Sequence, residues 1–369
     1  MGLNVGIVGL PNVGKSTIFS ALTSAPAEAA NYPFCTIEPN VGVVHVPDHR
    51  LDKLATLVKP ERTVPAIVEF VDIAGLVKGA SKGEGLGNQF LGHIRQVGAI
   101  AHVVRCFEDG DIIHVSGKVD PIDDVSTINV ELALADLESV NKRLQGIDRL
   151  IKSQDKIVST KGKIAKPILE KLVKTLGEGL PARSLELDAD EKEAIHDLHL
   201  ITMKPLMYVC NVDEANLTKE NEHVKKVREI AAKENAGVIT ICGKVESEIA
   251  ALGSKEEKEE FLKEIGIEES GLSKMIRAGY NLLGMYTYFT AGVKEVRAWT
   301  FPKGSKAPQA AGVIHSDFER GFIKAEIYHC EDLFNLLTEA KVKEAGKFRM
   351  EGKEYEVKDG DVIHFRFNV

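Results

Sequence analysis

Short apolar runs alternate with helical patterns along much of the chain. The runs with the length and β-branched content of buried strands span residues 3–8, 41–46, 66–71, 100–106, 206–210 and 238–242. Helical stretches separate most of them, and the first helix is predicted over 15–23, directly after a glycine-rich turn. This alternation predicts an α/β fold with a parallel sheet.

The chain between residues 106 and 206 is far longer than one crossover needs. Apolar residues have helical spacing over 129–151, 164–176 and 189–201. We therefore expect an inserted helical hairpin, and an antiparallel coiled coil is one form that it could take. Seven lysines and two acids lie between residues 151 and 176, and seven acids and two bases lie between 178 and 197. A basic arm that contacts RNA and an ordinary solvated helix face both fit this pattern.

A small mixed α/β module is predicted from about residue 284 onward. Strands are expected over 293–301, 322–327, 353–357 and 362–367, with a helix near 331–337.

Composition narrows the classes of function. The 369 residues include 47 Lys and Arg against 55 Asp and Glu, a net charge of −8, and 44% are hydrophobic. This is a globular composition, and its acidity argues against a surface that coats nucleic acid as a whole. The five cysteines contain no C-x-x-C pair, which argues against a disulfide framework or a zinc site. Cys35 lies in a predicted switch loop, where a redox role and a small buried thiol are both open.

No apolar stretch approaches the roughly 18 residues of a membrane span. The first residues also lack the basic start and apolar centre of a signal peptide. We therefore expect a cytoplasmic protein without a membrane partner.

The strongest motif is Gly9-Leu10-Pro11-Asn12-Val13-Gly14-Lys15-Ser16-Thr17, which fits G-x-x-x-x-G-K-[ST] between a strand and a helix. Its glycines let backbone N–H groups surround phosphates, and the helix N-terminus adds positive potential. We expect Lys15 to reach the β- and γ-phosphates and the Ser16 hydroxyl to bind Mg²⁺. The predicted nucleotide-binding residues of this loop are Asn12, Val13, Gly14, Lys15, Ser16 and Thr17.

A second motif supports a nucleotide switch. The run 66–71 leads into Asp72-Ile73-Ala74-Gly75, a D-x-x-G sequence. Asp72 would lie just beyond the direct ligands of Mg²⁺, and the Gly75 amide would meet the γ-phosphate. Between the two motifs, Thr36 is placed to complete the Mg²⁺ ligands when a γ-phosphate is present.

The glycine-rich residues 75–91, Gly-Leu-Val-Lys-Gly-Ala-Ser-Lys-Gly-Glu-Gly-Leu-Gly-Asn-Gln-Phe-Leu, strongly resemble the second switch of Obg-type P-loop NTPases. Residues 31–40 resemble their first switch, and the resemblance narrows to the YchF-type Obg-like ATPases over essentially the whole chain. It implies a P-loop NTPase G domain at 1–128 and 203–283, a helical or coiled-coil insertion at 129–202, and a β-grasp-like TGS domain at 284–369.

The base preference depends on Asn211-Val212-Asp213-Glu214. Guanine-specific relatives have N-K-x-D here; Val212 replaces the lysine along the base, and Glu214 replaces the aspartate that grips guanine. The longer carboxylate disfavours a bidentate grip, at a cost of about 1–3 kcal/mol. The resemblance likewise implies N-x-x-E and a preference for ATP over GTP, although a distorted guanine site stays open.

Leu76 stands where Ras-like enzymes carry a water-orienting Gln, so another group must polarise water. Asn12 occupies the position at which potassium-activated relatives place a cation ligand, which makes K⁺ a candidate. His114 is a candidate for orienting water, against the alternative of a surface histidine. The predicted catalytic residues are Lys15, Thr36, Gly75 and His114.

We therefore expect an Mg²⁺-dependent ATPase that acts as a molecular switch. The resemblance implies a ribosomal or translation-linked partner, reached through the helical arm and the TGS domain. Two alternatives remain at this point: a GTP-hydrolysing translation factor, and an RNA- or ribosome-binding module whose nucleotide site is only structural. A metabolic P-loop kinase is disfavoured, because no arginine-rich lid is evident in the sequence.

Overall fold

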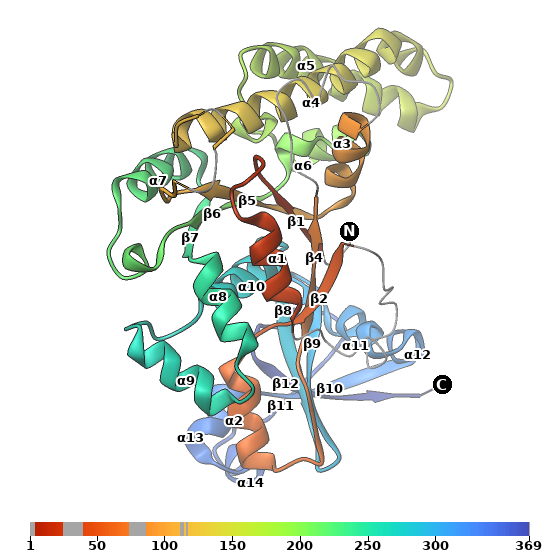
Figure 1. Ribbon diagram of the computed structural model, residues 1–369. Helices are drawn as coiled ribbons and strands as arrows, with labels where there is room; N and C mark the ends of the chain where they lie inside the picture. Colours follow the sequence, from red (N-terminus) through yellow and green to blue (C-terminus); the bar gives the residue numbers. More distant parts are fainter. Residues whose placement is uncertain (1–3, 25–39, 74–85, 111–113, 116, 369) are drawn as a thin grey trace. The chain divides into compact units, whose positions relative to one another are not determined.

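The computed structural model describes residues 4–24, 40–73, 86–110, 114–115 and 117–368 (Figure 1). These residues form two compact units. The first contains residues 4–24, 40–42 and 69–275, and the second contains 43–68 and 276–368. Among the described helices, none combines the length and apolar character needed to cross a membrane.

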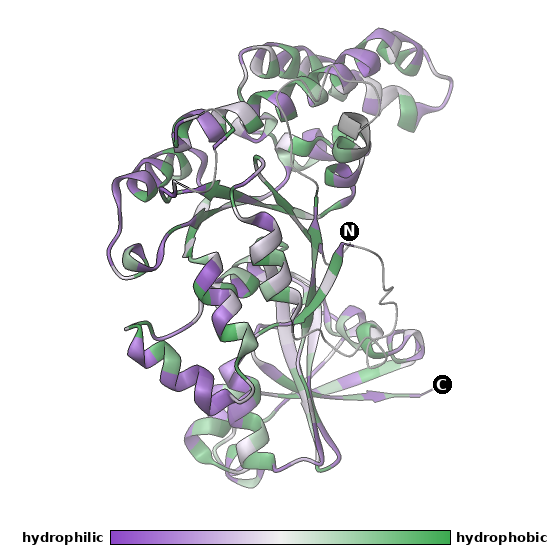
Figure 2. Ribbon diagram, in the orientation of Figure 1, coloured by the Kyte–Doolittle hydropathy of each residue, from purple (hydrophilic) through white to green (hydrophobic). Residues whose placement is uncertain are grey.

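One sheet has the strand order β2-β4-β1-β5-β6-β7, and its strands β1, β5, β6 and β7 lie wholly in the first unit. Its strands are β1 (Asn4–Val8), β2 (Val41–His45), β4 (Ile67–Asp72), β5 (Ala99–Arg105), β6 (Leu206–Asn211) and β7 (Gly237–Ile241). From β4 to β7 every adjacent pair is parallel. Strands β5 and β6 are buried at every position, and Figure 2 shows them as largely hydrophobic. Such continuous apolar strands are typical of a parallel sheet covered on both faces.

Helices connect these strands. They are α1 (Lys15–Thr23), α3 (Leu86–Gln96), α7 (Glu222–Glu234), α8 (Gly243–Ala251), α9 (Lys255–Glu264) and the start of α10 (Gly271–Leu282). Helices α1 and α8 contact each other, and α7 packs on β6. Helix α9 buries no residue, and Figure 2 shows it as mostly hydrophilic.

The long interval between β5 and β6 is a helical insertion. Helices α4 (Pro121–Ile151) and α5 (Lys156–Gly177) lie side by side (Figure 1), followed by η3 (Ala182–Ser184), α6 (Ala189–Ile195), η4 (His196–Leu198) and η5 (Ile201–Met203). Their apolar faces form one core that includes Val140, Ile147 and Leu172. Two lysines of the basic stretch pair with acids of the insertion itself, since Lys161 reaches Glu193 at 3.0 Å and Lys166 reaches Asp148 at 2.9 Å.

The second unit contains a mixed sheet with the order β11-β10-β12-β8-β9-β3. Its strands are β3 (Arg62–Val64), β8 (Met285–Ala291), β9 (Glu295–Pro302), β10 (Phe322–His329), β11 (Arg349–Glu351) and β12 (Asp361–Phe367); its helices are α2 (His49–Val58), α11 (Ala307–Ile314), α12 (Ser316–Arg320), α13 (Cys330–Leu336) and α14 (Glu339–Glu344). Pairs β12–β8 and β3–β9 are parallel, whereas β8–β9, β10–β12 and β10–β11 are antiparallel. Strand β3 and helix α2 come from the segment between β2 and β4, so the second unit is built from two distant parts of the chain.

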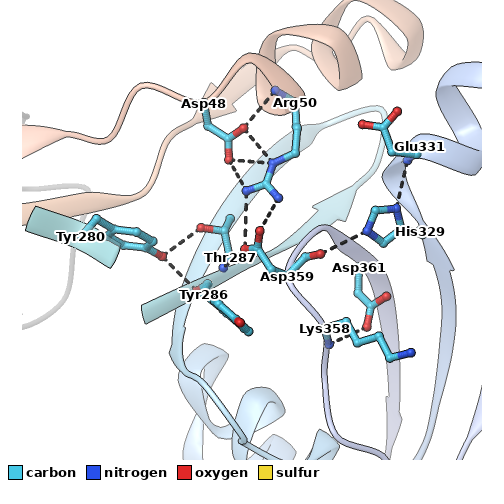
Figure 3. Close-up of polar contacts among 10 residues, drawn as sticks. All are labelled: Asp48, Arg50, Tyr280, Tyr286, Thr287, His329, Glu331, Lys358, Asp359 and Asp361. Atoms are coloured by element: carbon cyan, nitrogen blue, oxygen red, sulfur yellow. Dashed lines mark hydrogen bonds and ion pairs between the residues drawn. The ribbon is translucent and has the colours of Figure 1, made fainter. Parts of the chain in front are cut away.

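Arg50 joins these two parts (Figure 3). Its Nη1 donates to Asp359 Oδ2 at 2.6 Å and its Nε donates to Asp48 Oδ1 at 2.9 Å, while Asp359 Oδ1 accepts the Thr287 N–H at 2.8 Å. Burial alone would lower the pKa of Arg50, but the hydrogen bonds to the two carboxylates raise it overall. The guanidinium also lies 5.4 Å from the ring centroid of Phe289 in β8. One side chain thus links α2 to β8 and to the turn before β12.

Most predicted elements are confirmed, usually within one or two residues. The predicted strand 353–357 is wrong, because Tyr355 N–H closes a turn onto Gly352 O and only the single bridge Lys306–Glu356 forms. The predicted helix 189–201 ends at Ile195 and gives way to the 3₁₀ turns. The first helix of the insertion begins at Pro121, eight residues before the predicted start at 129.

Replacing Arg50 by Ala should destabilise the second unit by about 2 kcal/mol, because the carboxylate of Asp359 loses a charged hydrogen-bond partner. Trp299, the only tryptophan of the chain, lies in β9 and reports on this unit. Its fluorescence during urea unfolding measures the change.

The matched control is Arg320→Ala, since the Arg320 side chain is 76% exposed in its pair with Asp317. We expect it to change the free energy of unfolding by less than about 0.5 kcal/mol. Equal effects of the two substitutions would contradict a structural role for Arg50.

Candidate functional site

The loop between β1 and α1 has the tight backbone that the glycine-rich motif predicts. Gly14 has a φ of +94°, and a Cβ built there would lie 2.2 Å from Asn211 Nδ2. A Cβ on Gly9 would lie 2.5 Å from the carbonyl oxygen of Val103. Asn12 adopts a left-handed φ of +60°, which asparagine tolerates better than most residues. The backbone therefore passes close to β5 and β6 at the points where the motif has glycine.

Lys15 folds back over this loop. Its Nζ donates to Gly9 O at 3.0 Å and to Leu10 O at 2.7 Å, and the residue is 7% exposed. Burial lowers the pKa of Lys15 to about 8, although the charge of Asp72 opposes this shift. An ammonium held only by two backbone carbonyls can exchange them for other oxygen acceptors, and phosphate oxygens are acceptors of this kind. Ser16 and Thr17 follow it in the first turn of α1, and both are exposed.

Asp72 ends strand β4, the neighbour of β1. Burial raises its pKa, and the charge of Lys15 counteracts that effect. Its Oδ1 is buried and has no hydrogen-bond partner among the described residues. An unsatisfied carboxylate oxygen next to a buried ammonium fits a site for a hydrated cation. Within the described ranges, no cluster of three His, Cys, Asp or Glu side chains would hold a metal by protein ligands alone.

Asn211 connects the loop between β1 and α1 to the residues after β7. Its Nδ2 donates to Val13 O at 2.9 Å, and its Oδ1 accepts the Gly243 N–H at 3.0 Å. The side chain is 5% exposed, so both ends of the amide are committed to backbone partners. Asn211, predicted to contact the base, therefore acts in this structure as a brace between two loops.

The other two residues predicted near the base differ in exposure. Val212 is 2% exposed, and its N–H donates to Ile241 O at 2.8 Å. Glu214 is exposed at the start of η6 (Glu214–Asn216), which Asp213 caps by accepting the Asn216 N–H at 3.0 Å. Among these residues, Glu214 is the side chain available to a ligand.

His114 is a buried residue rather than a surface one. It is 6% exposed, and its Nε2 lies 3.0 Å from Oδ2 of Asp124, which is 2% exposed in the first turn of α4. His114 follows β5, and the parallel pairing of β1 with β5 sends the loops after both strands from the same edge of the sheet.

The structure brings the described site residues together only in part. Lys15 interacts with Asp72, and Asn211 contacts Val13 and Gly243, whereas Thr36 and Gly75 lie outside the described residues. Sequence reasoning missed Asp124. The signal was present, since Asp124 stands four residues before Ile128 on the buried stripe of α4, where an apolar residue is expected.

Comparison with known families agrees with this arrangement. Residues 4–145 match a family described as "50S ribosome-binding GTPase". Residues 285–368 match the YchF-GTPase C-terminal family, described as "Protein of unknown function (DUF933)".

Similar proteins match over the full chain. The "Ribosome-binding ATPase YchF" of Bacillus subtilis is 61% identical, and that of Escherichia coli O157:H7 is 58% identical, with 100% of both chains covered in each case. Among solved structures, the Schizosaccharomyces pombe YchF GTPase superposes with a TM-score of 0.88 at 43% identity, covering 99% of this chain and 98% of that one.

The lowered pKa of Lys15 predicts that the affinity for ATP depends on pH. Without nucleotide, the ammonium loses its proton near pH 8, so binding of phosphates above that pH must take up a proton. The Kd for ATP, measured by calorimetry, should change by less than about twofold between pH 7 and pH 7.5 and should rise toward about tenfold for each pH unit well above 8.

Lys15→Arg is the control, because a guanidinium stays charged throughout this range. Its affinity is expected to be lower but independent of pH. The same rise in Kd for both proteins would show that another group causes it.

Proposed function

The chain belongs to the YchF family, and we propose that it binds and hydrolyses ATP as an Mg²⁺-dependent molecular switch in contact with the ribosome. The observation that carries the proposal is the buried ammonium of Lys15, which two loop carbonyls hold beside the carboxylate of Asp72. When a Mg²⁺–triphosphate binds, its phosphate oxygens would replace the two carbonyls as partners of Lys15. Relatives similar over the whole chain are named ribosome-binding ATPases, which supports the activity and the partner.

The residues around Asp72 fit Mg²⁺. Ser16 and Thr36 would bind the ion directly, and the unpartnered Oδ1 of Asp72 would accept a hydrogen bond from one of its waters. When bound, Mg²⁺ supplies positive charge that offsets the negative charge of the β- and γ-phosphates. Lys15 would bind the same phosphates, and Asn12, Val13, Gly14 and Thr17 would complete their cradle.

In hydrolysis, the oxygen of water forms a bond to the γ-phosphorus as the bond to the ADP oxygen breaks, and the water proton passes to the phosphate formed. Lys15 and the Gly75 amide would stabilise the charge on the transferred group, with Thr36 ordered beside it. His114 would orient the water, because Leu76 has no polar group for that task. Asn12 would hold K⁺ as an additional positive charge.

The base site favours adenine. The amide of Asn211 keeps the phosphate loop and the Gly243 loop in place, and Val212 is buried where guanine-specific relatives carry lysine. Glu214 is one methylene longer than the aspartate that grips guanine. A tight bidentate contact with guanine is thereby disfavoured, which supports ATP over GTP.

The contact with the ribosome would be made through the helical arm, 129–202, and the TGS domain, 284–369, with 1–128 and 203–283 forming the G domain. Binding of ATP would order Thr36 and the Gly75 loop, and the helical arm and the TGS domain would transmit this change to the partner. Lys161 and Lys166 are already paired within the arm, so the other lysines of 152–174 are the better candidates for RNA. A ribosomal partner supports a cytoplasmic location.

The central test of the base site is a titration with fluorescent ATP and GTP. We expect a lower Kd for ATP, and we expect Glu214→Asp to narrow the preference by roughly tenfold, since it shortens the carboxylate to the length that binds guanine. The measurement is the ratio of the two Kd values in each protein.

Glu220→Asp makes the same one-methylene change at an exposed position later in the same loop, and it should leave the ratio unchanged. Tighter binding of GTP than of ATP by the unmodified chain would overturn the proposal in favour of a GTPase.

A further inference from the structure

Strands β2 and β4 are hydrogen-bonded neighbours and form a two-stranded ribbon. At one end of it, the Asp72 N–H donates to Asn40 O at 2.9 Å. At the other end, the Val46 N–H donates to Ala66 O at 2.8 Å, which makes the two strands antiparallel. The first pair of residues belongs to the first unit, and the second pair belongs to the second unit. Both strands of this β2–β4 ribbon therefore lead from the candidate site into the second unit.

The residues expected to respond to the γ-phosphate flank one end of the ribbon. Thr36 lies four residues before Asn40. On the other strand, Gly75 lies three residues after Asp72, whose buried Oδ1 has no hydrogen-bond partner among the described residues. Both strands would therefore be held at this end while Mg²⁺ and the γ-phosphate are bound, and both would be released when the γ-phosphate leaves.

The other end of the ribbon is built into the sheet of the second unit. Between Val46 and Ala66 the chain forms α2 and β3, and β3 pairs with β9 at all three of its residues. The Glu61 N–H extends this pairing, because it donates to Val293 O at 3.0 Å. The chain between the two strands of the ribbon is therefore a part of the second sheet and not a free loop.

Arg50 fastens helix α2 to the other strands of that sheet. Its Nη1 donates to Asp359 Oδ2 at 2.6 Å (Figure 3), and its guanidinium lies 5.4 Å from the ring centroid of Phe289 in β8. Further along α2, the Lys53 Nζ lies 5.2 Å from the ring centroid of Phe334 in α13. Because closely packed elements transmit strain, a displacement of the ribbon at this end would carry α2, β3 and the strands bonded to them.

Helix α10 also crosses between the units, since its residues up to Met275 belong to the first unit and those from Ile276 belong to the second. None of the residues expected to contact the nucleotide lies in this helix. The ribbon differs from α10 because residues expected at the phosphates flank both of its strands at the same end.

We propose that the β2–β4 ribbon transmits the nucleotide state of the candidate site to the sheet of the second unit, and that Arg50 anchors its far end. This inference rests on the proposed function, because the near end responds only when Mg²⁺ and ATP bind beside Asp72. Coupling between two sites is reciprocal. A partner that binds the second unit would therefore change the affinity for ATP through the same ribbon.

The test is amide hydrogen exchange in the full-length protein, saturated with Mg²⁺ and either ADP or the β,γ-imido analogue of ATP. The amides followed are those of Glu61, which donates to Val293 O, and of Thr287, which donates to Asp359 Oδ1. We expect both to exchange about fivefold or more slowly with the analogue than with ADP, because a ribbon held at its near end opens less often. Amides of α1 should be protected by either nucleotide, which shows that both are bound.

Arg50→Ala removes the anchor, so the difference between analogue and ADP at Thr287 should shrink to less than about twofold, with α1 still protected. Arg320→Ala, which changes an exposed arginine of the same unit, should keep the full difference. If Trp299 fluorescence shows that Arg50→Ala is unfolded, Arg50→Lys takes its place. A lysine cannot bond to both carboxylates as the guanidinium fork does, and it should lose at least half of the difference.

The outcomes separate the ribbon from the proposed function. Equal exchange at Glu61 and Thr287 with the two nucleotides, in an unmodified protein whose α1 both protect, would overturn transmission by the ribbon. A full difference at Thr287 in the folded Arg50 variant would overturn the anchoring role of Arg50. Failure of the analogue to protect α1 would instead contradict the proposed binding of ATP.

Discussion

The buried ammonium of Lys15 is the interaction on which the rest of the site depends. A charge that is 7% exposed is tolerable only because Gly9 and Leu10 offer carbonyls within 3.0 Å and Asp72 supplies an opposite charge. That geometry needs a loop that passes close to β5 and β6, which the glycines at 9 and 14 permit. It also needs the brace of Asn211, whose amide donates to Val13 O. Nucleotide phosphates would relieve the same buried charge.

The parallel sheet explains why these groups meet. Strands β1, β4, β5 and β6 point the same way, so the residues that follow them or end them gather at one edge. Lys15 follows β1, Asp72 ends β4, His114 follows β5 and Asn211 ends β6. The insertion leaves from this edge too, since α4 begins soon after His114 and carries the carboxylate that holds it. His114 and the first turn of α4 are therefore close together in the sequence.

The sequence predicted what short-range patterns determine. Runs such as 206–210 have the apolar continuity of buried strands, and the motif ending in Lys15-Ser16 defines its own loop. It did not predict that 62–64 would pair with β9, because the register of Arg62 with Glu295 depends on residues far apart in the chain. Asp124 was missed for a local reason. The helix was expected to start at 129, so this acid fell in an assumed loop and its place on the buried stripe was hidden.

The most direct test of the account is the Mg²⁺ dependence of ATP affinity, measured by calorimetry in the unmodified protein and in Asp72→Asn. The account predicts that Mg²⁺ strengthens binding in the unmodified protein and that this gain falls about tenfold or more in the variant. The reason is that Asp72, whose Oδ1 has no partner among the described residues, then loses the negative charge that would hold a water of the ion. Asp52→Asn, which removes an exposed acid of α2, should keep the full gain. The same gain in Asp72→Asn would contradict a site in which Lys15 and Asp72 together await a Mg²⁺–triphosphate.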